Sequence, residues 1–153
     1  MSRTDLAEAL LGWYDAHGRR FVFRGTKDPY RVWLSEIMLQ QTRVETVIPY
    51  YERFIRTFPD APSLAAADED LLHKVWQGLG YYTRARSLLA NAHIIVKDFH
   101  GEFPCQKEDV LKLKGLGPYT VASFLAFAFN APETVVDGNV IRIISRLYHL
   151  TKL

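Results

Sequence analysis

Two carboxylates in this sequence stand where they could work as an acid–base pair. Glu36 lies in the apolar run WLSEIMLQQT, and Asp137 lies between two valines and the run GNVIR. Apolar surroundings favour the protonated form of a carboxyl group, whereas a helix start favours the ionised form. A protonated acid beside a fixed anion can transfer a proton and stabilise a cation. Both residues also have plainer explanations, because Glu36 could lie on the exposed side of its helix and Asp137 could be an N-terminal cap.

The segment LKLKGLGPYT, residues 111–120, predicts a tight turn between two helices. Gly115 and Gly117 bracket Leu116, which we expect to anchor the turn in the core. The backbone N–H groups at the start of the following helix lack intrahelical partners, so they form a site suited to a DNA phosphate. A glycine turn between helices is common, and a purely structural turn is the alternative.

The elements that must position these residues are helical nearly throughout, because apolar residues recur at three- and four-residue steps. Thr4 and Asp68 are the expected N-caps of two helices, and Pro49 is expected to bend a third. The expected helices cover residues 4–18, 29–40, 44–58, 68–76, 83–99, 107–113 and 118–129, with a last one after residue 139. Only residues 133–136 are predicted to be extended. The fold class is therefore all-α.

Composition sets broad limits on what the chain can be. Its 153 residues are 48% hydrophobic and 24% charged, which is typical of a globular domain and argues against disorder. A net charge of +2 does not by itself identify a nucleic-acid binder. Basic residues do cluster at 19–31 and in the last sixteen residues, which contain no acid, and such patches can meet phosphates.

The single cysteine, Cys105, excludes a disulfide framework, a zinc site of several cysteines and a four-thiolate iron–sulfur cluster within this chain. The N-terminus carries acids and no long apolar core, so we do not expect a signal peptide. No apolar run reaches the roughly 18 residues of a membrane span. We expect a soluble monomer that is not secreted and does not bind membranes, cytoplasmic and associated with the nucleoid if the source is bacterial.

Three motifs carry a resemblance to known proteins. The run LKGLGPYT resembles the helix-hairpin-helix of base-excision DNA glycosylases, although the family often has proline where Lys114 stands. The runs SEIMLQQT at 35–42 and GLGYYTRAR at 78–86 resemble signature stretches of the MutY-type adenine glycosylases. All occur in the family's order and spacing. The chain is therefore identified as similar to MutY-type enzymes over essentially its whole length.

The resemblance implies a helix-hairpin-helix glycosylase fold with two parts. Residues 22–130 would form a six-helix barrel domain with the hairpin near 109–128. Residues 1–21 and 131–153 would form an incomplete second helical domain. Relatives continue beyond the position of Leu153 through further helices, a four-cysteine 4Fe–4S cluster loop and often a domain that reads 8-oxoguanine. We therefore expect a C-terminally truncated member with no cofactor within this chain.

The implied activity is hydrolysis of the N-glycosidic bond of adenine mispaired with 8-oxoguanine or guanine in double-stranded DNA. By resemblance, Glu36 protonates adenine, and Asp137 stabilises the cationic sugar or briefly bonds to it. Tyr119 stands where the related endonuclease III-type lyases carry a lysine nucleophile, and tyrosine cannot form a Schiff base. The resemblance thus implies a monofunctional hydrolase, in which Tyr119 and Asn139 support the two carboxylates.

The resemblance also implies how DNA and base are held. Gln41 and Tyr81 would wedge into the duplex, with Tyr81 beside the damaged guanine. The other expected DNA-binding residues are Lys114, Gly115, Gly117 and Thr120, and the expected base-pocket residues are Arg24, Leu39 and Val44. Leu39 and Val44 could instead be core residues, and Tyr81 an ordinary aromatic in a turn.

Other interpretations stay open. Phe23 stands where the family has a pocket tryptophan, which could alter base recognition. The chain could bind DNA without catalysis, or it could be a thymine-mismatch glycosylase on the same scaffold. Glu36 together with the pair Gln40-Gln41 favours adenine over thymine.

Overall fold

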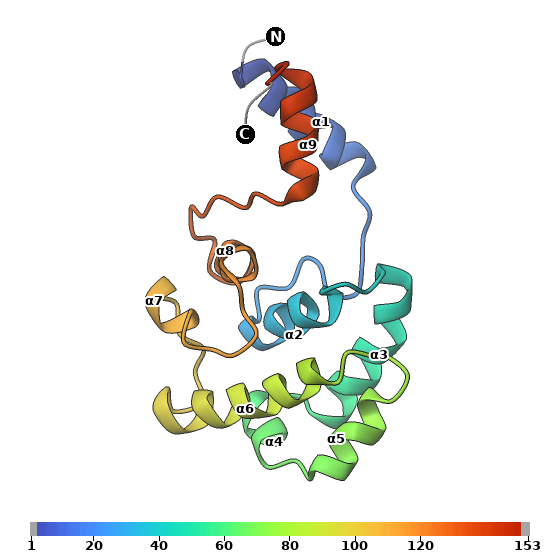
Figure 1. Cartoon of the computed structure of the whole chain (residues 1–153), viewed down its shortest axis with the longest axis vertical. Helices are drawn as coiled ribbons and strands as arrows, with labels where there is room; N and C mark the ends of the chain where they lie inside the picture. Colours follow the sequence, from blue (N-terminus) through green and yellow to red (C-terminus); the bar gives the residue numbers. More distant parts are fainter. Residues whose placement is uncertain (1–2, 151–153) are drawn as a thin grey trace.

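The computed structural model describes residues 3–150, and the part it describes is helical, with no strand. Figure 1 shows the helices in order along the chain. They are α1 (Arg3–His17), α2 (Pro29–Leu39), α3 (Val44–Thr57), α4 (Ala61–Ala65), α5 (Glu69–Trp76), α6 (Thr83–Asp98), α7 (Lys107–Val110), α8 (Pro118–Phe129) and α9 (Gly138–Leu147). The all-α prediction is confirmed.

Helix α2 lies at the centre of the packed body. It packs on α3, α6 and α8, while α4 packs on α6 and α5 on both α3 and α6. Nearly every residue of α2 from Tyr30 to Met38 is buried, so the helix is surrounded rather than amphipathic. The largest fully buried side chains of the core are Trp33, Phe54, Trp76 and Phe124. The buried side chains of α2 are therefore held in fixed positions.

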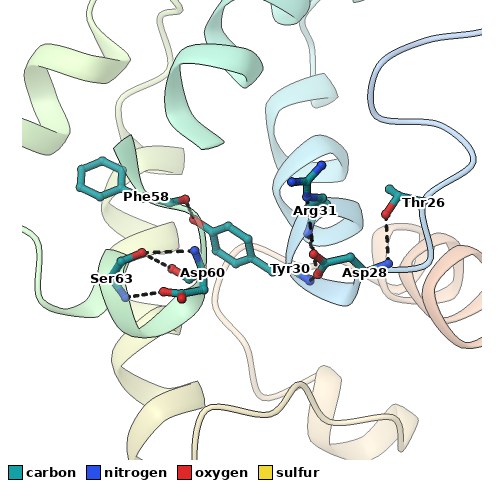
Figure 2. A network of polar contacts seen from close by, with 7 residues as sticks. All are labelled: Thr26, Asp28, Tyr30, Arg31, Phe58, Asp60 and Ser63. Atoms are coloured by element: carbon teal, nitrogen blue, oxygen red, sulfur yellow. Dashed lines mark hydrogen bonds and ion pairs between the residues drawn. The ribbon is translucent and has the colours of Figure 1, made fainter. Parts of the chain in front are cut away.

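The start of α2 is fixed by a polar network (Figure 2). The Asp28 carboxylate accepts hydrogen bonds from the backbone N–H groups of Tyr30 at 2.9 Å and Arg31 at 3.5 Å, and Pro29 suits the first turn. The buried Tyr30 hydroxyl donates to the Phe58 carbonyl at 2.7 Å, just past the end of α3. Burial raises the pKa of Tyr30, and the nearby carboxylates of Asp60 and Asp28 add to this. The phenol therefore stays a neutral donor that ties α2 to the α3–α4 connection.

Helices α1 and α9 lie beside each other at one end of the molecule, and the last turn of α1 approaches α8 (Figure 1). A cavity of about 510 Å³ between them is lined by Leu6, Ile144, Tyr148 and Leu150. Helix α9 has a strongly one-sided apolar pattern but no buried residue. None of the helices within residues 3–150 combines the length and apolar composition of a membrane span.

Three local predictions need correction. Thr4 does not cap α1, because the helix already includes Arg3. The helix expected over residues 107–113 ends at Val110, since the chain turns there into the glycine loop. The short α4 was missed, although Asp60 and Ser63 form a reciprocal capping box at its start (Figure 2). The predicted cap of α5 by Asp68 is confirmed.

Candidate active site and nucleic-acid interface

The Glu36 carboxyl group is buried, with 8% of the side chain exposed. It lies within the surrounded part of α2, so the interpretation that places it on an exposed face is wrong. Its Oε1 lies 3.5 Å from the Arg24 Nη1, which donates to it. A buried carboxyl group needs such a partner or a proton.

Arg24 connects Glu36 to an aromatic cavity. Its guanidinium lies 4.3 Å from the centre of the Phe127 ring and 5.9 Å from that of Phe23. The cavity has a volume of about 400 Å³ and is lined by Trp13, Tyr14, His17, Gly18, Arg19, Phe21, Arg24 and Phe127. Flat aromatic faces and guanidinium groups are the surfaces on which a planar base stacks.

None of the aromatic residues that line this cavity was predicted from the sequence as a site residue. Phe21 lies in the irregular basic segment, and Phe127 reads as one more apolar residue of α8. Leu39 and Val44, in contrast, are half-buried and pack against the hydrophobic core. Their base-pocket role stays a prediction, and the interpretation of both as core residues agrees with this packing.

Asp137 is the N-cap of α9, as the plainer explanation has it. Its Oδ1 accepts from the Val140 backbone N–H at 2.8 Å, and its Oδ2 accepts from the Asn139 side-chain amide at 3.1 Å. Arg142 in turn donates to the Asn139 Oδ1 at 2.8 Å. The Val140 N–H, aided by Asn139, holds the pKa of the Asp137 carboxyl below its usual range. Asp137 is therefore a fixed anion at the surface.

The pKa of the Tyr119 phenol is influenced by the charges of three other predicted residues. Partial burial raises the pKa of its phenol, the negative charges of Glu36 and Asp137 raise it further, and the Arg24 cation opposes them. The side chain is 45% exposed. The charges of Glu36, Asp137 and Arg24 thus all act on the Tyr119 phenol, although α2 and α9 are distant in sequence.

The glycine hairpin links α7 to α8. The structure explains its two glycines differently. Gly115 has a φ of +76°, which favours glycine, and a Cβ there would meet Ser87. Gly117 has a φ of −77° and open space around its Cα, so the fold does not demand glycine there. No side chain caps α8, so the N–H groups of its first turn have no side-chain acceptor at the N-cap. The close approach of a phosphate to these groups would explain why glycine stands at position 117.

The loop of the hairpin is held by buried or half-buried partners. Leu116 is buried, as predicted. Asn91 of α6, fully buried, pairs with both backbone groups of Lys114. The Gln40 side-chain amide donates to the Gly115 carbonyl at 3.1 Å and to the Thr120 hydroxyl at 3.4 Å. Lys114, Gly115 and Gly117 are exposed and Thr120 is buried, so the first three can reach a ligand directly.

The two predicted wedge residues share an uncommon backbone geometry. Gln41 has a φ of +56° and Tyr81 one of +48°, and both side chains are exposed, Tyr81 by 59%. A positive φ in a non-glycine residue is costly and persists only where neighbouring groups enforce it. Both residues are therefore presented at the surface by fixed turns.

The residues of this chain do not fit an iron–sulfur cluster. The sequence has one cysteine, Cys105, which is exposed, whereas such a cluster needs four thiolates. Within residues 3–150 no group of three or more His, Cys, Asp or Glu side chains gathers in a way that could hold a metal ion.

Curated relatives resemble the chain over nearly all of its length. It is 42% identical over 144 residues to an adenine DNA glycosylase of Buchnera aphidicola subsp. Baizongia pistaciae, covering 94% of this chain and 41% of the relative. It is 38% identical to the adenine DNA glycosylase of Homo sapiens, covering 91% of this chain and 27% of the relative. The chain therefore spans less than half the length of these relatives.

Solved structures share the fold. A thermostable thymine-DNA glycosylase matches with a TM-score of 0.88 and 27% identity, over 94% of this chain and 66% of that one. A trapped covalent complex of endonuclease III with DNA matches with a TM-score of 0.79 and 19% identity, over 97% and 70%. Residues 34–153 match the family of HhH-GPD superfamily base excision DNA repair proteins. Since this match spans both predicted carboxylates and the hairpin, the chain belongs to the HhH-GPD superfamily of base excision DNA repair proteins.

Proposed function

We propose that this protein is a monofunctional DNA glycosylase that removes adenine mispaired with 8-oxoguanine or guanine. One observation carries the proposal: the buried carboxyl group of Glu36, partnered by Arg24, shares the surroundings of Tyr119 with the ionised Asp137. An acid and a separate fixed anion are what cleavage of a glycosidic bond through a cationic sugar requires. The similarity to adenine DNA glycosylases supports adenine as the base.

In the reaction, the N–H groups at the start of α8 and Lys114 hold a phosphate of the duplex, and the adenine is extruded from the stack. Glu36 donates its proton to a ring nitrogen of the adenine, so the electrons of the N-glycosidic bond leave with a neutral base. The Asp137 carboxylate stabilises the cationic sugar. Water adds to the sugar carbon and gives up a proton to Glu36, which restores the acid.

The residue type at Tyr119 determines which nucleophile attacks the sugar carbon. Its phenol has no amine to attack the sugar carbon, and its raised pKa keeps it a neutral hydrogen-bond donor beside the carboxylates. Water is then the nucleophile, and the DNA strand is left intact at an abasic site. We propose that the aromatic cavity beside Arg24 receives the extruded base, and that Asn139 holds Asp137 in its orientation.

The proposal includes a division of the chain into two parts. Residues 22–130, with the hairpin near 109–128, would form the six-helix barrel domain, and residues 1–21 and 131–153 a second helical part. The separate position of α1 and α9 in Figure 1 supports this division. Residues 1–2 and 151–153 lie outside the described residues.

The test compares the 153-residue chain with Glu36→Gln on duplexes that contain A·8-oxoguanine, A·G or G·T. Adenine release from the first two, reduced about 10²- to 10⁴-fold by Glu36→Gln, is the expected result. Glu45→Gln is the matched control, because the Glu45 side chain is exposed and lies 4.0 Å from Arg19. Tight binding without release by the wild-type chain would indicate a DNA-binding protein without catalysis.

Thymine-mismatch activity is the second candidate, favoured by the TM-score of 0.88 to the thymine-DNA glycosylase. Release of thymine from the G·T duplex, with no adenine from the others, would establish it instead. Monofunctional hydrolysis predicts an abasic product that is cleaved only after alkali, and no cross-link when the reaction contains borohydride. A cross-linked protein–DNA species would contradict the role of water as the nucleophile.

A further inference from the structure

The guanidinium of Arg84 is buried where two surface turns meet, with 8% of the residue exposed. Its Nη1 donates to the carbonyls of Met38 at 2.7 Å and Gln40 at 2.6 Å, and to a third at the end of α2, Ile37, at 3.2 Å. Its Nη2 donates at 3.5 Å to the carbonyls of Leu79 and Gly80. One side chain therefore joins the end of α2 to the loop before α6.

Each bonded turn holds one of the two left-handed residues described above. Gln40 directly precedes Gln41, and Gly80 directly precedes Tyr81. The Tyr81 ring also lies over the Arg84 guanidinium, with 5.2 Å between the Cζ atom and the ring centre. Gln41 follows the end of α2, as His100, Asn130 and His149 follow other helix ends, where a left-handed residue commonly closes a helix. Among the described residues, Tyr81 is the one non-glycine residue with positive φ that does not close a helix.

The chemistry of the arginine side chain suits this junction. The carbonyls in the last turn of a helix lack the N–H donors of a following turn, and they form the negative end of the helix dipole. A planar guanidinium presents donors in several fixed directions, whereas a lysine ammonium presents three donors from one point. The carbonyls also compensate a buried cation that would otherwise be costly. The Arg84 Nε has no hydrogen-bond partner, so the polar contacts of the guanidinium go to these two turns.

We propose that Arg84 is a positioning residue that locks Gln41 and Tyr81 together, so that both enter the duplex as one unit. This inference rests on the proposed function for its consequence, which is extrusion of the base rather than cleavage of its bond. Without Arg84, each turn relaxes separately, and the two wedges no longer hold the gap open at the same time.

The first test measures hydrogen exchange in the free 153-residue chain, so it does not depend on activity. The amides of Gln40, Thr42 and Leu79 donate to carbonyls within the two turns. In Arg84→Lys we expect these three amides to exchange about tenfold to a hundredfold faster. Amides in the middle of α3 should keep their wild-type rates. Faster exchange in one turn alone, or in neither, overturns the proposal.

Arg53→Lys is the matched control. Arg53 also donates two hydrogen bonds to a carbonyl, that of Val75, and lies over the ring of Tyr50, but it bonds to neither turn. The exchange of Gln40, Thr42 and Leu79 should stay at the wild-type rate in this variant. An effect equal to that of Arg84→Lys would show a general loss of stability and overturn the proposal.

A second variant leaves Arg84 in place. Tyr81→Ala removes an exposed ring that packs on the guanidinium, so the fold should persist. Coupling through Arg84 predicts faster exchange of the Thr42 amide, which lies in the other turn. An unchanged Thr42 amide contradicts the proposal even if Arg84→Lys does not fold.

Base release measured under single-turnover conditions distinguishes an effect on extrusion of the base from an effect on cleavage of its bond. For adenine paired in a duplex, Arg84→Lys should release base about tenfold to a hundredfold more slowly. For adenine opposite an abasic site, where less stacking and pairing must be broken, the loss should be severalfold smaller. Equal losses on the two substrates would overturn the positioning role. If the wild-type chain releases no base, the proposed function fails, while the exchange measurements still decide the role of Arg84.

Discussion

Asn91 pairs with the backbone of Lys114 through both ends of its side-chain amide. The Asn91 Nδ2 donates to the Lys114 carbonyl at 2.8 Å, and the Lys114 N–H donates to the Asn91 Oδ1 at 2.7 Å. Asn91 is fully buried on α6, so this pair fixes the hairpin loop to the body of the protein. Since Arg84 lies on the same helix seven residues earlier, α6 holds both the hairpin and the two wedge turns.

Replacing Asn91 by alanine leaves two backbone groups without partners. We expect Asn91→Ala to lower the free energy of unfolding by about 2–4 kcal/mol, and to weaken binding to duplex DNA at temperatures where the protein stays folded. Denaturant titration and a binding titration measure the two effects. Leu88→Ala is the control, because Leu88 is fully buried on the same helix and should cost about 3 kcal/mol without weakening DNA binding. Equal weakening by both variants would show that only stability matters.

Alanine should have different effects at the two hairpin glycines, lowering the stability at Gly115 and weakening DNA binding at Gly117. Gly115→Ala places a Cβ 3.4 Å from the Ser87 Oγ at a φ of +76°, and should destabilise the protein by roughly 1–2 kcal/mol. Gly117→Ala meets nothing within 4 Å and should leave the melting temperature unchanged. It should nevertheless weaken DNA binding, because a methyl group then stands where a phosphate approaches the helix start. Unchanged DNA binding by Gly117→Ala would argue against a phosphate at that point.

Asp137 is both the N-cap of α9 and a proposed catalytic anion. Its replacement by asparagine keeps the cap and removes the charge. Asn caps a helix as well as Asp does, so Asp137→Asn should keep the cap, lose only the stability that the charge contributes at pH 7, and lose most base release. The pKa of Asp137 is lower in the folded than in the unfolded protein, so its charge stabilises the fold above about pH 4. This contribution is lost as the pH falls through the folded-state value.

Melting curves between pH 2 and 7 test the stability part of this prediction. Asp137→Asn should show a smaller loss of stability in acid than the wild-type chain. Asp137→Ala should be less stable than either at pH 7, because it lacks the cap. Full base release by Asp137→Asn would exclude a catalytic role for the carboxylate.

Tyr30 lies outside the proposed active site and provides a structural prediction. Tyr30→Phe removes the hydrogen bond to the Phe58 carbonyl and should cost about 1 kcal/mol, which lowers the melting temperature by about 2–4 °C. Base release at a temperature well below the transition should be unchanged. A loss of base release with an unchanged melting temperature would contradict this assignment.

Much of the fold could be predicted because its signals are local. The limits of α2, α5, α6 and α8 follow from apolar periodicity and from local start signals such as the Asp68 cap and Pro118 in the first turn, which act within one helical turn. The short α4 was missed because five residues give too few positions for a helical period. The early end of the helix that begins at Lys107 depends on the loop that follows it.

Sequence alone determined the helical class, the hairpin with its two glycines, and the two carboxylates with Tyr119 as candidates for chemistry. The helical class and the hairpin depend on residue type and on neighbours in the chain, and the roles of the two carboxylates and Tyr119 come from the resemblance to a known family. Only the tertiary structure decided that Glu36 is buried against Arg24 and that Phe127 reaches the same arginine. It alone showed that Arg84 bonds two turns about forty residues apart in sequence. Packing of α2 against α6 and α8 creates these relationships, and a one-dimensional pattern carries no record of which helix faces meet.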